Sequence, residues 1–271
     1  FTARRSAIKA RTAARVQLKS LLVTAPTFLR ERFRDVTDVA LITGLADFDI
    51  RPYPEHQGTV IALRLLARRH RYLATEIRAL DQELETLTAY VNPALIAAAG
   101  VGPVTAAQLL ITAGDNPDRL RSEAAFAALC GASPIPASSG KTNRHRLNRG
   151  GDRHANSALH RVALVRMSYE PRTKAYVEKK RAEGKSSKEI IRCLKRAIAR
   201  EVFTLLTKEV EVPRVDDLRP FRQALGVTLQ QVAAHFNVWA VKISRIERGL
   251  TRDDDLAQAY REWLETSAPT S

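Results

Sequence analysis

Two adjacent serines, Ser138 and Ser139, stand before Gly140 at the start of the most basic part of the chain. Residues 141–200 hold 18 Lys and Arg against 5 Asp and Glu, so they carry +13 of the chain's formal charge of +15. A serine hydroxyl can attack phosphorus, and fixed cations stabilise the negative charge that builds there. The pattern therefore indicates nucleic acid as the partner, with the serine either a nucleophile or part of a solvated binding loop. The cations that follow the serines most closely are Lys141, Arg144, Arg146, Arg149 and Arg153.

The sequence excludes several other kinds of chemistry. The Gly-x-Ser-x-Gly turn of serine hydrolases is absent, and the phosphate-loop signature fails because Lys179 stands where its first glycine belongs. No spacing of His, Cys, Asp and Glu predicts a metal site. No apolar run approaches the about 18 residues that a membrane-spanning helix needs, so we expect no membrane partner. Cys130 and Cys193 lie in helical patterns, and we expect both to be inert core residues.

Apolar periodicity and scarce strand signals predict a mainly α fold in three parts. These are a helical or coiled-coil assembly region over residues 1–93, a domain over 94–212 that holds the serines, and a C-terminal domain over 213–271. In the first part we expect a basic helix over 3–35, kinked or ended by Pro26, and a connector over 36–58. In the second we expect helices at about 122–131, 152–169 and 186–208, with Pro171 and Gly184 separating the last two.

A heptad pattern runs through the end of the first part. Apolar residues recur at spacings of three and four for about four heptads, with one histidine among them, which is typical of a coiled-coil seam. The pattern also fits one long helix that packs on its own domain. The residues of the pattern are Leu63, Leu66, His70, Leu73, Ile77, Leu80, Leu84, Leu87 and Val91.

The turn Gly100-Val101-Gly102-Pro103 separates two apolar helical segments. Two glycines permit a tight turn, and proline suits the first turn of the helix that follows. The pattern predicts the hairpin of a helix-hairpin-helix, whose backbone N–H groups at Gly100 and Gly102 bind one phosphate without reading sequence. A plain turn between two helices fits the same residues.

Residues 218–249 resemble the helix-turn-helix of Cro and phage-repressor regulators. Thr228 is expected to cap the second helix of that motif. The third helix, at about 239–248, would enter the major groove and present Lys242 and Arg245 to DNA. Trp239 stands where a serine cap is usual, so DNA contact and a structural or protein-contacting role both stay open.

A set of motifs in the second part occurs in an order that resembles one family. The motifs are Gly100-Val101-Gly102-Pro103-Val104-Thr105-Ala106, Gly114-Asp115, Phe126-Ala127-Ala128-Leu129-Cys130-Gly131-Ala132-Ser133-Pro134, Ser139-Gly140-Lys141, Arg149-Gly150-Gly151-Asp152-Arg153 and Ala158-Leu159-His160-Arg161-Val162-Ala163. The set resembles the C-terminal domain of the insertion-sequence "one-ten" family of bacterial transposases, the 116/902-related group, which is related to the Piv-type DNA invertases. The resemblance covers about residues 4–208 and is most specific over 98–200.

The resemblance implies a serine-dependent DNA recombinase. Ser139, or Ser138 as the near alternative, would attack a DNA phosphate and form a covalent phosphoserine link. The heptad helix would assemble dimers and then a synaptic tetramer, and a structured RNA from the element would guide the reaction. Acidic residues of a separate ribonuclease-H-like N-terminal domain would bind Mg²⁺. That domain lies outside this chain, in which we expect no cofactor.

Two functions remain after these observations. The first is a transposase or site-specific recombinase of an insertion sequence, in a chain that is truncated or a decayed copy. Residues 1–271 alone should then not cleave DNA efficiently. The second is a non-enzymatic DNA-binding protein, either a regulator or a transposase relic. A coiled-coil protein with incidental charge is a weaker third. We expect a protein of the bacterial cytoplasm, associated with the nucleoid.

Overall fold

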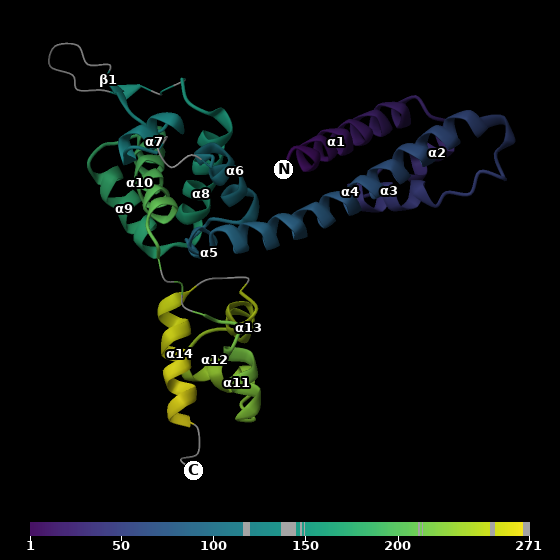
Figure 1. Ribbon diagram of the computed structural model, residues 1–271. Helices are drawn as coiled ribbons and strands as arrows, with labels where there is room; N and C mark the ends of the chain where they lie inside the picture. The colour runs from purple at the N-terminus through teal and green to yellow at the C-terminus, as the bar shows by residue number, and fades with distance from the viewer. Residues whose placement is uncertain are drawn as a thin grey trace. The chain divides into compact units, whose positions relative to one another are not determined.

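The computed structural model describes residues 1–115, 120–136, 145–146, 148, 150–210, 212, 214–249 and 253–267 (Figure 1). Over these residues the chain is mostly helical, with one pair of two-residue strands, which confirms the predicted mainly α class. It divides into two compact units, Phe1–Thr88 and Ala89–Ser271, and each is described by itself below. The three predicted domain ranges stay predictions.

The first unit is built from two long helices and the short helices between them. Helix α1 (Thr2–Val23) lies beside α4 (Gln57–Val91) and runs antiparallel to it, because Arg4 pairs with Asp81 while Leu18 shares a core with Leu63 (Figure 1). The chain between them forms α2 (Thr27–Arg32), α3 (Asp38–Ala46) and the 3-10 turn η1 (Pro54–His56). Their apolar side chains close the end of this antiparallel pair of helices.

The heptad pattern of α4 is buried only in part. Leu63, Leu73 and Ile77 are buried, and the last two pack against α1. Leu87 and Val91 are 55% and 62% exposed. The N-terminal part of the seam therefore packs within the chain, as one of the two predicted arrangements requires. A coiled coil between chains stays a prediction.

One expectation for the first 58 residues is confirmed and another is wrong. The predicted helix over 3–35 is interrupted at Pro26 as expected, since α1 ends at Val23 and Pro26 precedes the first residue of α2. The predicted connector over 36–58 contains α3. Thr37 caps α3 by accepting a hydrogen bond from the Ala40 N–H, and the apolar run that follows packs into the core.

In the second unit, α8 (Arg153–Tyr169) is the central helix of an all-helical core. It lies between α6 (Pro103–Ala113) and α10 (Ser187–Thr207), and it also contacts α9 (Pro171–Ala182) (Figure 1). Small residues such as Ala155, Ala158 and Ala163 are fully buried and let the helices approach closely. Two short helices, α5 (Pro93–Ala97) and α7 (Glu123–Leu129), pack on α10.

Helix α9 is a correction to the predicted break between 169 and 186. Pro171 occupies the first turn of α9, where its missing N–H costs nothing, so it begins a helix instead of preventing one. Only Thr173 and Val177 of α9 are buried, which explains why the sequence shows almost no apolar periodicity there. Gly184 follows the helix end, as expected.

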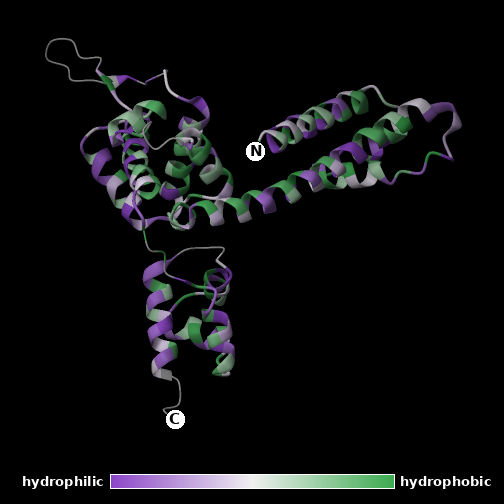
Figure 2. Cartoon of the chain, in the orientation of Figure 1, coloured by the Kyte–Doolittle hydropathy of each residue, from purple (hydrophilic) through white to green (hydrophobic). Residues whose placement is uncertain are grey.

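The segment over 215–264 has an apolar cluster of its own, formed by α11 (Leu218–Ala224), α12 (Leu229–His235), α13 (Ala240–Glu247) and α14 (Asp254–Ser267). The expected cap at Thr228 is confirmed, because its hydroxyl accepts a hydrogen bond from the Gln231 N–H. Helix α14 was not expected from the sequence. Figure 2 shows that α14 carries both hydrophilic and hydrophobic residues, and its buried residues Ala257, Tyr260 and Leu264 recur every three or four positions, as in an amphipathic helix.

Arg166 ties three elements of the second unit together. Its guanidinium is buried on α8 and donates two hydrogen bonds to the Glu201 carboxylate of α10, at 2.6 and 2.9 Å. Its Nε donates to the backbone carbonyl of Ala99, at 2.7 Å. Arg166 belongs to the basic tract, so part of the tract's charge stabilises the core and cannot bind a ligand.

We expect Arg166→Ala to lower the free energy of unfolding by about 2–3 kcal/mol, because it leaves the Ala99 carbonyl and the Glu201 carboxylate without their partner. Arg172→Ala is the matched control, since Arg172 is exposed on α9 and its loss should cost less than about 0.5 kcal/mol. Urea unfolding followed by circular dichroism measures both. Equal midpoints for the two variants would contradict the role of Arg166.

Candidate nucleic-acid interface

A two-residue antiparallel pairing joins the chain on either side of the predicted serines. Strand β1 (Ile135–Pro136) pairs with β2 (His145–Arg146), with Ile135 opposite Arg146 and Pro136 opposite His145. The backbone is therefore held at the two positions that flank residues 137–144. Five of the predicted site residues lie outside the described residues: Ser138, Ser139, Lys141, Arg144 and Arg149.

A chain of hydrogen bonds anchors the segment that leads into β1. The Lys195 ammonium of α10 donates to Asn156 Oδ1 at 2.9 Å. Asn156, on α8, donates through its amide nitrogen to the carbonyls of Cys130 and Gly131, at 2.9 and 2.8 Å. Lys195 is 5% exposed. Burial, and next the charge of Arg192, lower the pKa of Lys195 below its usual value.

The segment that follows β2 is held by a close backbone contact between Gly151 and Gly131. Gly131 has a φ of +63°, in the left-handed region that favours glycine. A Cβ on Gly151 would lie 2.3 Å from the Gly131 nitrogen, so only glycine fits at 151. These two glycines let the segments before β1 and after β2 pass within backbone contact of each other.

Asp152 completes the anchor. Its N–H donates to the Leu129 carbonyl at 2.7 Å, and its carboxylate accepts from the Thr112 hydroxyl at 2.6 Å and from the His154 N–H at 2.7 Å. Burial acts to raise its pKa, but the hydrogen bonds from Thr112 and His154 prevail, so the pKa of Asp152 is below its ordinary value. The charged carboxylate thus caps α8 and joins it to α6, while the backbone N–H of Asp152 joins it to the last residue of α7.

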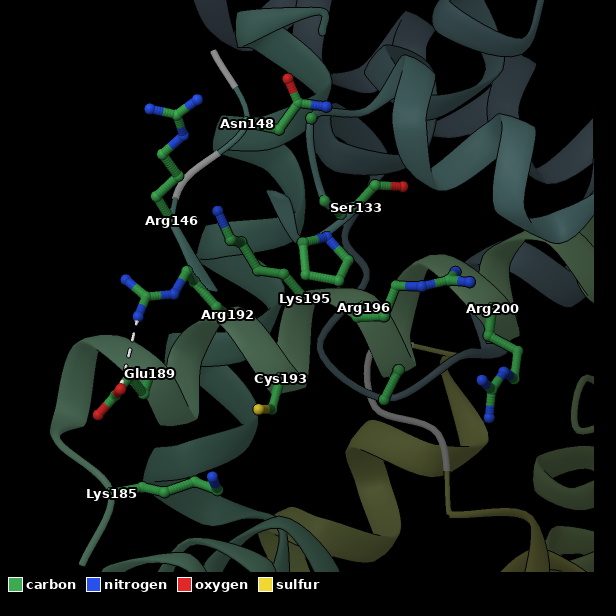
Figure 3. Close-up of a pocket in the computed structure, with 14 residues that line it drawn as sticks. Ser133, Arg146, Asn148, Lys185, Glu189, Arg192, Cys193, Lys195, Arg196 and Arg200 are labelled. Atoms are coloured by element: carbon green, nitrogen blue, oxygen red, sulfur yellow. Dashed lines mark ion pairs between the residues drawn. The ribbon is translucent and has the colours of Figure 1, made fainter. Parts of the chain in front are cut away.

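A pocket of about 460 Å³ lies between these anchored segments and α10 (Figure 3). One wall is the chain at 131–134 with Arg146 and Asn148, and the other is α10 with Lys185. Its apolar lining comes from Ala132, Pro134 and the side of α10. One carboxylate, that of Glu189, faces six cations in the lining. The six are Arg146, Lys185, Arg192, Lys195, Arg196 and Arg200.

Three of these cations follow the helical repeat of α10. Arg192, Arg196 and Arg200 are four residues apart and therefore lie along one face. Arg196 pairs with Glu123, and Arg200 lies 3.1 Å from the same carboxylate. Arg192 is 4.0 Å from Glu189. Three arginines against the two carboxylates of Glu123 and Glu189 leave this face with a net positive charge.

The predicted Gly100–Gly102 turn is present between α5 and α6, but one of its donors is already in use. The Gly102 N–H donates to the Thr105 hydroxyl at 2.9 Å, and that hydroxyl donates to the Gly102 carbonyl at 2.7 Å. The Val101 N–H donates to the Ala98 carbonyl at 3.1 Å. A phosphate bound by the Gly102 N–H would have to displace Thr105, and phosphate binding at this turn stays a prediction.

The other described site residues lie apart from the pocket lining. Arg153 is exposed at the first residue of α8. In the C-terminal segment Arg245 is exposed on α13, whereas Lys242 is 2.7 Å from the Asp253 carboxylate. Of the predicted cations that the structure describes, only Arg146 is among the residues that line the pocket.

The cations of α10 and Lys185 were not predicted as site residues. The spacing of Arg192, Arg196 and Arg200 was a visible signal, because it marks one helix face. Cys193 corrects a second expectation: it is partly exposed and lines the pocket, whereas Cys130 is fully buried as expected.

Among the residues that the structure describes, no group of three or more His, Cys, Asp or Glu could hold a metal ion. The described helices also include none that is long and apolar enough to cross a membrane.

A family of known proteins is similar to the part of the chain that forms one wall of this pocket. Residues 92–178 match the model of the Transposase IS116/IS110/IS902 family. The match agrees with the predicted resemblance at this coarse level, and it ends before α10.

Two insertion-element proteins are similar to the chain over longer stretches. The Insertion element IS110 uncharacterized 43.6 kDa protein of Streptomyces coelicolor is 30% identical over 144 residues, which are 49% of this chain and 35% of that protein. The Insertion element IS900 uncharacterized 42 kDa protein of Mycobacterium paratuberculosis is 27% identical over 193 residues, 66% of this chain and 46% of that protein. The matched part of the chain therefore spans less than half of the length of either relative.

We expect Gly151→Ala to destabilise the second unit by about 2–3 kcal/mol, because the new methyl group would overlap the backbone of Gly131. Gly150→Ala is the matched control, since its methyl group would meet only the Asn148 side chain, at 3.3 Å. Thermal unfolding distinguishes them. If the two variants unfold at the same temperature, the close contact at 151 is wrong.

The two cysteines should differ in reactivity. Burial, and next the charge of Asp152, raise the pKa of Cys130 to about 12, so almost no thiolate forms at pH 8. Iodoacetamide at pH 8 should therefore modify Cys193 and spare Cys130, and both should react in urea. Mass spectrometry of the digested protein measures the sites. Equal native rates at the two thiols would contradict the described packing of Cys130.

Proposed function

We propose that this chain is the strand-joining part of an insertion-element transposase, which binds DNA and reacts with it through Ser139. The observation that carries the proposal is the β1–β2 pairing. It holds Pro136 and His145, which flank the serine segment, and it places Arg146 opposite the cationic face of α10. The transposase-family match over 92–178 supports the same conclusion.

The proposed step is a transesterification. The Ser139 oxygen forms a bond to a DNA phosphorus, one bond from that phosphorus to a deoxyribose oxygen breaks, and the displaced oxygen takes up the serine's proton. The number of phosphate ester bonds is unchanged, so rejoining the strand needs no added energy source. Nearby guanidinium and ammonium groups would stabilise the extra negative charge of the five-coordinate phosphorus.

The remaining parts of the proposal concern groups outside the described site. A ribonuclease-H-like domain with bound Mg²⁺ would help to cleave the strand, and an element-encoded RNA would select the DNA. The described residues of this chain do not offer a set of ligands that fits Mg²⁺, so no step here is assigned to the metal. The exposed end of the α4 heptad would join two copies of the chain.

The proposed role of Ser139 as the nucleophile can be tested with a pool of DNAs that carry a bridging phosphorothiolate at one central position. A thiolate leaves readily, which reduces the need for metal assistance, and its departure makes the adduct persist. The chain should become covalently attached to DNA, with the added mass on the peptide that holds residues 138 and 139. Ser139→Ala should abolish the adduct, and Ser138→Ala, the matched control, should retain it.

Fluorescence anisotropy with unmodified DNA accompanies this assay, because both variants keep every Lys and Arg and should bind as tightly as the original chain. An adduct that survives in Ser139→Ala would contradict the assignment. DNA binding without any adduct would favour the second candidate, a DNA-binding protein without catalysis. That candidate is supported by the compact α11–α14 segment, which exposes Arg245 on α13.

A further inference from the structure

We infer that the pocket between α10 and the anchored segments holds one unpaired nucleotide of a DNA strand. Its phosphate would lie against the cations, and its sugar and base would enter the apolar interior. The inference rests on the proposed function only in taking DNA as the substrate. It adds a binding site for a single strand, with named residues, beside the serine segment.

The charge distribution supports a phosphate at the pocket mouth. Arg146 approaches from β2, Lys185 from the turn before α10, and Arg192 from α10 itself, so that three separate segments supply a cation (Figure 3). Neither Arg146 nor Lys185 forms an ion pair with another described residue, and Arg192 has only the 4.0 Å approach to Glu189. Cations that are not already neutralised are the ones that an incoming phosphate can bind.

The volume of the pocket favours a nucleotide over a duplex backbone as its occupant. Phosphates of a duplex are bound by exposed side chains and need no cavity. A volume of about 460 Å³ lies within the range of about 300–1,000 Å³ that is usual for sites that enclose a small molecule. A base can enter such a space only when it is unpaired.

The lining also fits the parts of a nucleotide. Ala132, Pro134, Cys193 and Ala197 provide apolar contacts for the sugar and the base. Asn148 and Ser133 add polar side chains to the lining (Figure 3). Among the described residues, the lining contains no aromatic side chain and few groups that could read a base edge. Binding should therefore depend little on the identity of the base.

Filling the pocket without changing its charge tests the inference. Ala197 is exposed on α10 and lines the pocket, so Ala197→Leu adds bulk there and should not disturb the fold. The matched control is Ala182→Leu on α9, which is also exposed and lies outside the lining. Binding of an oligothymidine and of a duplex is measured by fluorescence anisotropy, with circular dichroism to verify folding.

Ala197→Leu should weaken oligothymidine binding about tenfold and change duplex binding by less than about twofold, while Ala182→Leu changes neither. Equal losses for strand and duplex would overturn the inference, because they would indicate a surface contact, and so would no loss at all. These results are independent of Ser139, so the inference and the proposed phosphoserine chemistry can fail separately.

Protection of Cys193 gives a second readout at the site. Because Cys193 lines the pocket, bound oligothymidine should slow its alkylation by iodoacetamide, and a duplex at equal saturation should not. A parallel measurement with free thymidine monophosphate distinguishes a nucleotide that belongs to a strand from a free nucleotide. Stronger protection by the mononucleotide than by the strand would overturn the inference in favour of a free-nucleotide site, and unchanged alkylation with saturating strand would overturn it entirely.

Discussion

The hydrogen bond from Lys195 to Asn156 is the interaction on which the proposed site depends. Asn156 uses its other polar atom to hold the carbonyls of Cys130 and Gly131, so one lysine on α10 fixes where the chain leaves α7. That departure point determines the path into β1, and the Gly131–Gly151 contact determines the path back from β2. The position of the pocket follows, because its two walls are this segment and the helix that carries Lys195.

The basic tract has two roles that its composition does not distinguish. Arg166 and Lys195 are buried and hydrogen-bonded within the protein, where they hold helices and turns in place. Arg146, Lys185 and Arg192 stand at the pocket with weak pairing or none among the described residues. The buried cations give rigidity to the surface on which the others are presented, and preorganised cations lose less freedom when they bind a phosphate.

Local signals in the sequence were reliable where one residue decides the geometry. Thr228 caps α12 and Gly184 follows the end of α9, as expected. Prediction was poorer where burial decides. The α3 segment is too short to show a period, and α9 buries too few apolar residues to show one. The pocket depends on contacts between residues far apart in sequence, such as Asn156 with Cys130, and no local pattern encodes them.

The central claim is that the cations at the α10 pocket bind nucleic-acid phosphates, and the salt dependence of single-strand binding tests it most directly. Each phosphate contact contributes about 0.7 to the slope of log affinity against log salt for a single strand. Because the pocket binds one phosphate, replacing Arg146, Lys185 and Arg192 together by alanine should lower that slope by about 0.7. A triple variant of exposed cations outside the lining, Arg172, Lys174 and Lys188, should change it much less. Equal slopes for the two triple variants would contradict the account.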